Sequence, residues 1–385
     1  MFLRTVIILQ FFISTYQQQT VLEVSEQDLS IELGRSASFK VTVNQKLQQP
    51  AEIYPSSNLP WVANVSEESV TLPSSQSNAS AELHVMTYHA GECYIEFNTS
   101  SSEIDVSETF VRISVMRLEW LDIVIAIIGW MYFVAWSVSF YPQIVLNFRR
   151  KSVVGLNFDF LSYNLTGFIA YGMYNVGMYW IPEVWAEYKE SHPRGVNPVQ
   201  LNDVVFTLHA IVVTAFTIFQ CCIYERAGQK VSKVCMVLLS LAWAFAITTL
   251  IIAAASSGNI ISWLNYLLYL SYIKLGVTLI KYIPQAYMNF RRKSTEGWSI
   301  GNVLLDFTGG SLSLLQMFLI SYNYNDWKSI FGDPTKFGLG VFSICFDILF
   351  IVQHYVLYRG NAPKDINSEE TDKLLKKGTR RYASL

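Results

Sequence analysis

The chain has 385 residues, of which 51% are hydrophobic and only 15% are charged. A soluble domain usually carries about 25% charged residues, so this composition excludes an ordinary soluble protein and indicates a membrane protein. The formal net charge of −2 gives no sign of a nucleic-acid partner. The five cysteines have neither a metal-binding spacing nor the pattern of a disulfide framework, and we expect no metal and no cofactor.

Residues 1–18 are predicted to form a secretory signal peptide. Arg4 precedes a short apolar run from Val6 to Ile13. That run is too short to cross a bilayer, which takes about 20 apolar residues, but it is typical of a signal sequence.

Residues 19–118 are predicted to form a glycosylated, lumenal β-sandwich. Runs of alternating apolar and polar residues recur at 36–43, 81–85 and 109–115 between clusters of Ser, Asn and Pro. This segment also carries three Asn-x-Ser/Thr sequons, which place it in a lumen or outside the cell. The sequon asparagines are Asn64, Asn78 and Asn98.

Residues 119–359 are predicted to form a helical membrane domain. Seven apolar runs are long enough to cross about 30 Å of hydrocarbon as helices. Basic residues follow spans one, three and five, so the positive-inside rule predicts a lumenal N-terminus and a cytosolic C-terminus. The predicted spans are 121–143, 157–180, 203–224, 233–255, 261–287, 299–321 and 338–358.

The membrane domain contains an internal repeat. Pro142-Gln143 near the end of span one recurs as Pro284-Gln285 near the end of span five, 142 residues later, and each pair is followed by Asn-Phe-Arg-Arg-Lys-Ser. We therefore predict two parallel three-helix units, 121–224 and 261–358, joined by a linker helix over 233–255. Repeats related in this way are typical of transporters that bind substrate between the repeats.

Several polar side chains lie inside the predicted spans, where an ionisable group costs roughly 2.5–3.5 kcal/mol. Span five carries Lys274 and Lys281, and span six carries Asn302 and Asp306; each pair is spaced to share one helical face. Asp203 and Asp347 lie in spans three and seven, the latter with His354 seven residues on. Ion pairs or snorkelling end groups would explain such residues structurally, above all Asp203 and His354 near span ends.

The two repeats differ where these charges lie. Lys281 corresponds to Ser139, and Asp306 corresponds to Asn164. A lysine and an aspartate facing one cavity suit a zwitterionic substrate, since the lysine attracts its carboxylate and the aspartate its ammonium. Burial also favours the protonated form of an aspartate, so an acidic lumen could supply Asp306 with a proton.

The Pro-Gln pairs are interpreted as hinges. A proline removes one helical hydrogen bond and bends the helix, and we expect the neighbouring glutamine amide to bond to the freed groups of its own helix. The hinge residues would be Pro142, Gln143, Pro284 and Gln285. A static kink is the alternative.

A repeated Pro-Gln pair at the ends of spans one and five resembles the PQ-loop transporter family. Within it, the segments 129–143, 293–310 and 331–340 resemble the lysosomal cystine exporters. The resemblance implies proton-coupled symport of L-cystine from the lysosomal lumen to the cytosol, and a link to lysosomal nutrient-signalling machinery. It implies cystine contacts at Asn164, Lys274, Lys281, Tyr282, Asn302 and Asp306, and proton handling at Asp203, Asp306 and Asp347.

Residues 360–385 are predicted to be a cytosolic tail with sorting motifs. Leu374-Leu375 follows acidic residues, and Tyr382 with Leu385 resembles a tyrosine-based signal in which Arg381 replaces the family's glycine. Motifs of this kind bind clathrin adaptor complexes, so we expect residence in the lysosomal membrane.

Three other functions are open at this stage. A PQ-loop exporter of cationic amino acids should have more acid and fewer lysines in its cavity, and a sugar carrier would not need Lys281 beside Asp306. A seven-span receptor would share the topology but would not need the repeat. An enzyme is not expected, because no nucleophile–base pair or metal cluster is evident.

Overall fold

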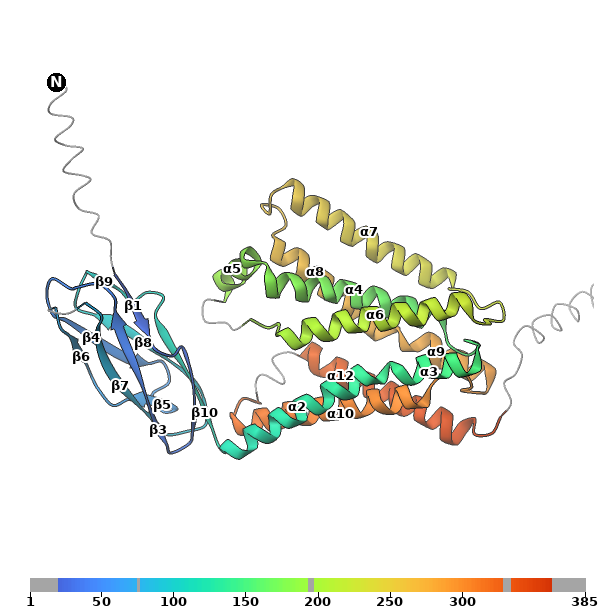
Figure 1. Cartoon of the computed structure of the whole chain (residues 1–385), viewed down its shortest axis with the longest axis horizontal. Helices are drawn as coiled ribbons and strands as arrows, with labels where there is room; N and C mark the ends of the chain where they lie inside the picture. The colour runs from blue at the N-terminus through green and yellow to red at the C-terminus, as the bar shows by residue number, and fades with distance from the viewer. Residues whose placement is uncertain (1–19, 75–76, 193–196, 328–333, 362–385) are drawn as a thin grey trace, which may run out of the picture. The chain divides into compact units, whose positions relative to one another are not determined.

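The computed structural model describes residues 20–74, 77–192, 197–327 and 334–361. It divides into two compact units, one drawn from residues 1–127 and 316–333 and the other from 128–315 and 334–385. Figure 1 labels their elements. The predicted signal peptide and the sorting residues Leu374, Leu375, Tyr382 and Leu385 lie outside the described residues.

The N-terminal part forms two five-stranded sheets, as the alternating pattern predicts. Their strand orders are β5-β7-β3-β1-β9 and β2-β10-β8-β4-β6. Most neighbours are antiparallel, but β1 pairs with β9 and β2 with β10 in parallel. The strands are β1 Thr20–Val24, β2 Asp28–Glu32, β3 Ser36–Val43, β4 Ala51–Ser57, β5 Ala63–Val65, β6 Val70–Leu72, β7 Ala79–Thr87, β8 Gly91–Thr99, β9 Ile104–Asp105 and β10 Phe110–Met116.

Alternate residues of both sheets fill one apolar core. In β3, Phe39, Val41 and Val43 are buried while the residues between them are more exposed. They join Ile95 and Ile113 of the other sheet in a single cluster. Burying one face of each sheet in this way explains the period of two in the sequence.

The sequon asparagines occupy accessible positions. Asn78 and Asn98 are exposed and Asn64 is half-buried. These positions are compatible with the predicted glycosylation, which stays a prediction.

The remainder of the described chain is helical, and each predicted span coincides with a helical segment. The helices are α2 Glu119–Ser139, α3 Tyr141–Arg150, α4 Phe158–Trp180, α5 Pro182–Ser191, α6 Leu201–Ile223, α7 Lys233–Ala255, α8 Trp263–Ile280, α9 Tyr282–Arg292, α10 Ile300–Asn323 and α12 Pro334–Val352, which continues as the π-helical turn Gln353–Leu357.

Six of the described helical segments are long and apolar enough to cross a membrane, and α4 is not among them. Asp159, Asn164 and Asn175 are all buried in α4. Figure 1 shows α4 next to α6 and α8. Asn175 donates to Thr207 of α6 and Asn164 accepts from Lys281, so these polar side chains face protein. The predicted crossing by all seven spans therefore stays a proposal.

The short helix α5 was not predicted. Pro182 occupies its first turn, a position where proline is favoured. Its aromatic side chains stack in sequence, with Trp185 and Tyr188 ring centres 5.4 Å apart and Tyr188 and His192 4.5 Å apart. The sequence pattern missed it because α5 lies between two long apolar runs and is itself polar.

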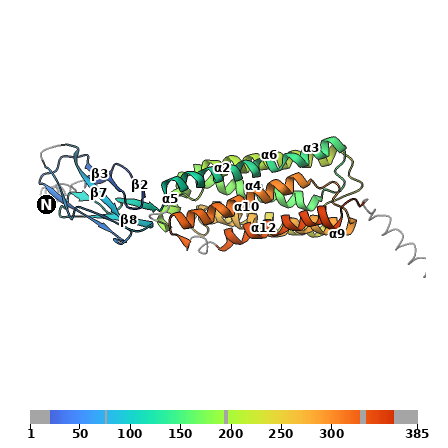
Figure 2. The same cartoon turned by 90° about the horizontal axis from the view of Figure 1, so that it is seen from below.

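Spans one and five each divide into two consecutive helices just before their Pro-Gln pair, where a proline bend is predicted. Helix α2 ends at Ser139 and α3 begins at Tyr141; α8 ends at Ile280 and α9 begins at Tyr282. Pro142 and Pro284 follow within a few residues, and neither can donate the backbone hydrogen bond that would continue the helix. The linker α7 lies at the outer edge of the bundle in Figure 1, and α2 runs beside α10 in Figures 1 and 2.

Candidate functional site

The break between α8 and α9 sends two adjacent polar side chains in different directions. Lys281 is only 9% exposed, and its ammonium donates to Asn164 Oδ1 of α4 at 3.2 Å. The hydroxyl of Tyr282 donates to Asp306 Oδ2 of α10 at 2.9 Å. The ammonium of Lys281 therefore bonds to the first repeat, while the hydroxyl of Tyr282 bonds within the second, and the two residues lie at the seam between the repeats.

Tyr282 also connects α10 to α12. Its hydroxyl lies 3.0 Å from Ser343 Oγ, and its ring stacks on Phe346 with centres 5.5 Å apart. The rings of Phe160 and Phe350 lie at 5.9 and 6.1 Å. These rings pack around the buried Tyr282 and fix the orientation of its hydroxyl.

Lys274 lies about two helical turns before Lys281, on α8. Its ammonium is 4.0 Å from the ring centre of Phe168, which gives a cation–π contact with α4. Gly167 makes room for this lysine, because a Cβ there would lie 3.2 Å from Lys274 Cδ. Both lysines of span five thus face α4, as their spacing predicted. Asn302 is half-buried in the first turn of α10, one turn before Asp306.

Asp347 is 2% exposed, and its Oδ2 has no hydrogen-bond partner among the described residues. It lies four residues after Ser343, hence on the same face of α12. An unpaired carboxylate is costly in such a place, so the site suits an acid that carries a proton. His354, on the turn that follows, pairs instead with Thr295 Oγ1 at 2.7 Å.

The structure brings Asp203 to a different place from the other acids. It lies in the first turn of α6, where its carboxylate accepts a bond from the Gln200 N–H at 2.9 Å in a capping box. The capping box gives Asp203 a structural role, and this role explains the residue without any part in proton transfer.

The two glutamines of the Pro-Gln pairs bond across the repeats. Gln143 donates to the carbonyl of Gly297 at 3.0 Å and accepts from the Ser299 N–H at 2.8 Å. Gln285 donates to the carbonyl of Gly155 at 3.0 Å and accepts from the Asn157 N–H at 2.7 Å. The expectation that each amide serves its own kink was wrong, because the opposite loop offers a donor and an acceptor in the geometry of an amide. We call this reciprocal pair the glutamine clasp.

Each half of the glutamine clasp is backed by a buried amide chain that the sequence analysis missed. Gln143 donates to Asn147, which donates to Gln220 of α6 at 2.9 Å. In the second repeat, Gln285 donates to Asn289, which donates to Gln353 at 3.0 Å. Gln220 and Gln353 do not share the 142-residue spacing, so the repeat alone did not reveal them. The sequence signal that could have revealed them is a single glutamine near the end of an apolar span.

Two glycines permit the loops of the clasp to meet. Gly155 and Gly297 have positive φ angles of 102° and 95°. A Cβ on Gly155 would lie 2.0 Å from the Glu296 carbonyl oxygen, and one on Gly297 would lie 2.0 Å from that of Val154. No other residue type fits either position, which explains why both copies of the motif contain Gly.

Neither charge of the seam is neutralised by the other. In the described parts of the chain, Lys281 donates a hydrogen bond to an amide and Asp306 accepts one from a hydroxyl, and no salt bridge joins the two residues. The same residues contain no group of three or more His, Cys, Asp or Glu side chains that could hold a metal. The arrangement can therefore receive a ligand with both a negative and a positive group.

Comparison with known proteins identifies the family. The PQ loop repeat matches residues 124–184 and 266–326. Cystinosin from Drosophila melanogaster is 47% identical over 344 residues, which cover 89% of this chain and 85% of the relative. Cystinosin from Bos taurus is 47% identical over 336 residues, which cover 86% and 89%.

A more distant relative, named cystine transporter, comes from Saccharomyces cerevisiae and is 28% identical over 259 residues, which cover 63% of this chain and 96% of the relative. The two matches to the repeat have the same spacing as the Pro-Gln pairs. The alignments with the fly and cow relatives cover most of this chain and most of each relative. The chain belongs to the cystinosin family of PQ-loop proteins.

Proposed function

We propose that this protein transports L-cystine out of the lysosome into the cytosol together with protons. It is a transporter and not an enzyme, and its relatives include proteins named cystinosin and cystine transporter. The single observation that carries the proposal is the arrangement of Lys281 and Asp306, each held at the seam by a neutral partner.

Cystine is zwitterionic at both ends, and the seam offers a group for each charge. Lys281 can exchange its bond to Asn164 for a substrate carboxylate, and Asp306 can exchange its bond to Tyr282 for an ammonium. Because both present partners are uncharged, each exchange replaces a hydrogen bond to a neutral group by an ion pair, in which both partners carry a charge. Lys274 and Asn302, one turn or two away, complete the proposed contacts.

Proton coupling is assigned to Asp306 and Asp347. The Tyr282 hydroxyl contacts both Asp306 and Ser343, and Ser343 shares a helical face with Asp347. This order of groups supports a proton path between the two acids. The role of Asp203 in proton handling rests on the family resemblance, and its capping contact at the start of α6 is the structural alternative.

Alternating access is assigned to the Pro-Gln breaks. The glutamine clasp holds the two repeats together at the end of the bundle that carries the basic loops. Releasing it would free four hydrogen bonds and let the broken helices swing about residues 140 and 281. The proposed hinge thus consists of Pro142, Gln143, Pro284 and Gln285, with the glutamines acting between the repeats.

The basic loops support an orientation with the clasp on the cytosolic side and the β-rich part in the lumen. Sorting to lysosomes is assigned to Leu374-Leu375 and to Tyr382 with Leu385, through clathrin adaptors. Contact with lysosomal nutrient-signalling machinery is proposed from the resemblance alone.

A counterflow assay tests the substrate. Purified protein in liposomes filled with unlabelled cystine should accumulate labelled cystine at equal pH on both sides, and excess arginine, lysine or glucose should not compete. Lys281→Met should abolish accumulation, while Lys233→Met at the start of α7 should leave it intact. Counterflow of lysine or arginine without cystine would instead establish the cationic amino-acid exporter.

A further inference from the structure

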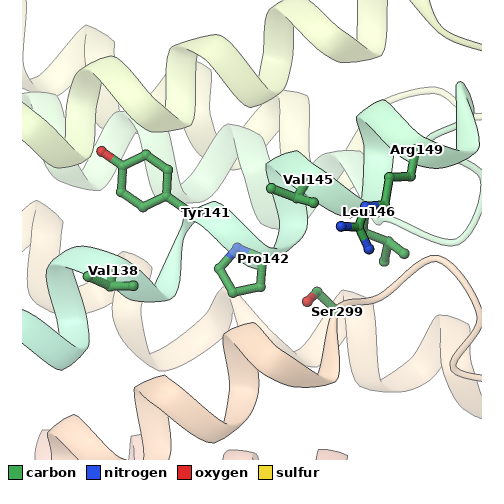
Figure 3. Close-up of a pocket in the computed structure, with 7 residues that line it drawn as sticks. All are labelled: Val138, Tyr141, Pro142, Val145, Leu146, Arg149 and Ser299. Carbon is green, nitrogen blue, oxygen red and sulfur yellow. The ribbon is translucent and has the colours of Figure 1, made fainter.

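A groove of about 440 Å³ lies on the outer side of the first Pro-Gln break. Its walls are side chains of α2 and α3, among them Val138, Tyr141 and Pro142, and Ser299 just before α10. Figure 3 shows these side chains along one side of the broken helix, with Arg149 at one end. The groove thus joins a helix of the first repeat to the start of a helix of the second.

The groove opens on a surface that a membrane would cover. Helices α2 and α3 together form a candidate span, Glu119–Arg150, with a mean hydropathy of 2.0. Val138, Tyr141 and Val145 are 43%, 44% and 43% exposed. From Val138 to Arg149 the helix rises at most about 17 Å at 1.5 Å per residue, which matches one leaflet of a hydrocarbon core about 30 Å thick.

The charged end of the groove carries a guanidinium without an acidic partner in the part of the chain that the structure describes. Of the three consecutive basic residues there, Arg150 pairs with Glu296 at 3.0 Å, and Lys151 lies 3.5 Å from the ring centre of Phe148. Arg149 is exposed, and no acidic side chain pairs with it among the residues that the structure describes. A free arginine at the membrane–water boundary attracts a phosphate group, which it can bind through two parallel hydrogen bonds.

The second repeat carries different side chains at the positions that line the groove. Its counterparts of Val145 and Leu146 are the larger Tyr287 and the longer, unbranched Met288. The counterpart of Ser299 is Asn157, whose side chain donates to the Pro284 carbonyl at 3.3 Å. Arg291 corresponds to Arg149, so the second repeat keeps the charge but has a tyrosine in place of Val145.

We propose that the groove binds one anionic phospholipid from the leaflet on the side of the basic loops. Its phosphate binds Arg149, and one acyl chain lies along Val145, Tyr141 and Val138. By the orientation under the proposed function, this is the cytosolic leaflet of the lysosomal membrane. Because Pro142 directly precedes Gln143 and Ser299 is one of the two loop residues that Gln143 bonds to, the bound lipid braces the first half of the glutamine clasp.

Photolabelling tests the site without requiring transport. The full-length protein is reconstituted in phosphatidylcholine nanodiscs that contain a trace of phosphatidylserine with a diazirine on its acyl chain. The crosslinked residues are then mapped by mass spectrometry. Labelling is expected at residues 138–146, and phosphatidylcholine with the same photoreactive chain should label them about fivefold less, because one arginine contributes about 1 kcal/mol of attraction.

Three variants distinguish the contribution of the lipid headgroup, that of the shape of the groove and that of basic charge elsewhere on the protein. Arg149→Gln should remove the preference for the anionic lipid, and Val145→Tyr, which copies the second repeat, should remove labelling of residues 138–146 by either lipid. Arg291→Gln should change neither. Equal labelling by the two lipids in the wild type, or unchanged labelling in Val145→Tyr, would overturn the proposal whatever the counterflow assay shows. Thermal unfolding of each variant confirms that it is folded.

Discussion

Gln143 and Gln285 each hydrogen bond to the loop that belongs to the other repeat. Gln143 holds Gly297 and Ser299, and Gln285 holds Gly155 and Asn157. Both glutamines are at most 4% exposed, so their four bonds form out of contact with water. The Pro-Gln motif therefore combines a helix break with a fastening between repeats, and this pairing underlies the proposed movement.

Replacing one clasp glutamine should favour a conformation in which the two basic loops lie farther apart. Gln143→Leu leaves a buried carbonyl and a buried N–H without partners, each costing about 1–3 kcal/mol. The clasped state should lose population by on the order of tenfold or more, since 1.4 kcal/mol is a factor of ten. Spin labels on the two basic loops should then report longer distances.

Gln285→Leu should have an effect of similar size, because its contacts are equivalent. Leu replacement at Gln316, which bonds to Ile125 away from the clasp, serves as the control. Unchanged distances in both clasp variants would show that the glutamines do not hold this end closed.

Gly155→Ala should prevent the two loops from meeting. Its Cβ would overlap the Glu296 carbonyl, in addition to the strain of a positive φ angle, which costs about 1–3 kcal/mol. Gly228 is a matched control, since its φ is 72° but nothing lies within 4 Å of the added carbon. Thermal unfolding of the purified protein should show a large drop for Gly155→Ala and a small one for Gly228→Ala. Equal drops in the unfolding temperature would mean that the destabilisation comes from backbone strain and not from the close approach of the two loops.

Much of the seam was predictable because charges inside a membrane are expensive. Lys281 and Asp306 stood out because charged groups are costly in a span and because their counterparts in the first repeat are neutral. In the structure Lys281 bonds to Asn164 of the first repeat, and Asp306 bonds to the adjacent Tyr282. Ser343 was missed because a serine costs little in an apolar helix and gives no signal. The partners of Gln143 and Gln285 were missed for another reason: they lie more than 120 residues away in sequence, and only the folded arrangement of the loops supplies a donor and an acceptor for each amide.

Asp306→Asn should abolish proton-coupled flux while the protein still folds and reaches the lysosome. The amide keeps the size of the side chain but can neither attract a substrate ammonium nor carry a proton. Tyr282→Phe should lower the flux by roughly tenfold, because it removes one hydrogen bond to a charged group, worth about 1.5–3 kcal/mol. Proton-driven flux at the wild-type level in Asp306→Asn would remove this residue from the mechanism.

The β-rich part should contain a contact that weakens in strong acid. The carboxylate of Glu67 accepts from the His84 N–H at 2.9 Å and lies 2.6 Å from its ring Nδ1. Burial tends to raise the pKa of this carboxyl, but the bonds from His84 outweigh it and hold the pKa below its usual value of 4.5. The stabilisation is thus complete above pH 4.5 and is lost as the pH falls through the lowered pKa.

Hydrogen exchange at the His84 amide measures this contact. Glu67→Gln, which resembles the protonated acid, should exchange severalfold faster than the wild type above pH 4.5, and the two should converge in stronger acid. The Ile113 amide in the other sheet should be unaffected. A difference that persists unchanged at the lowest pH would contradict the assignment.

The most direct test of proton-coupled cystine transport uses the protein at the cell surface, where the proposed lumenal side faces the medium. Deleting residues 382–385 should bring part of the protein there; complete retention in lysosomes would assign sorting to Leu374-Leu375 or another signal. Labelled cystine uptake and membrane current are then followed at acidic and neutral outside pH. We predict cystine uptake that rises in acid and carries inward current. No cystine flux at either pH, with the protein present at the surface, would contradict the proposed function.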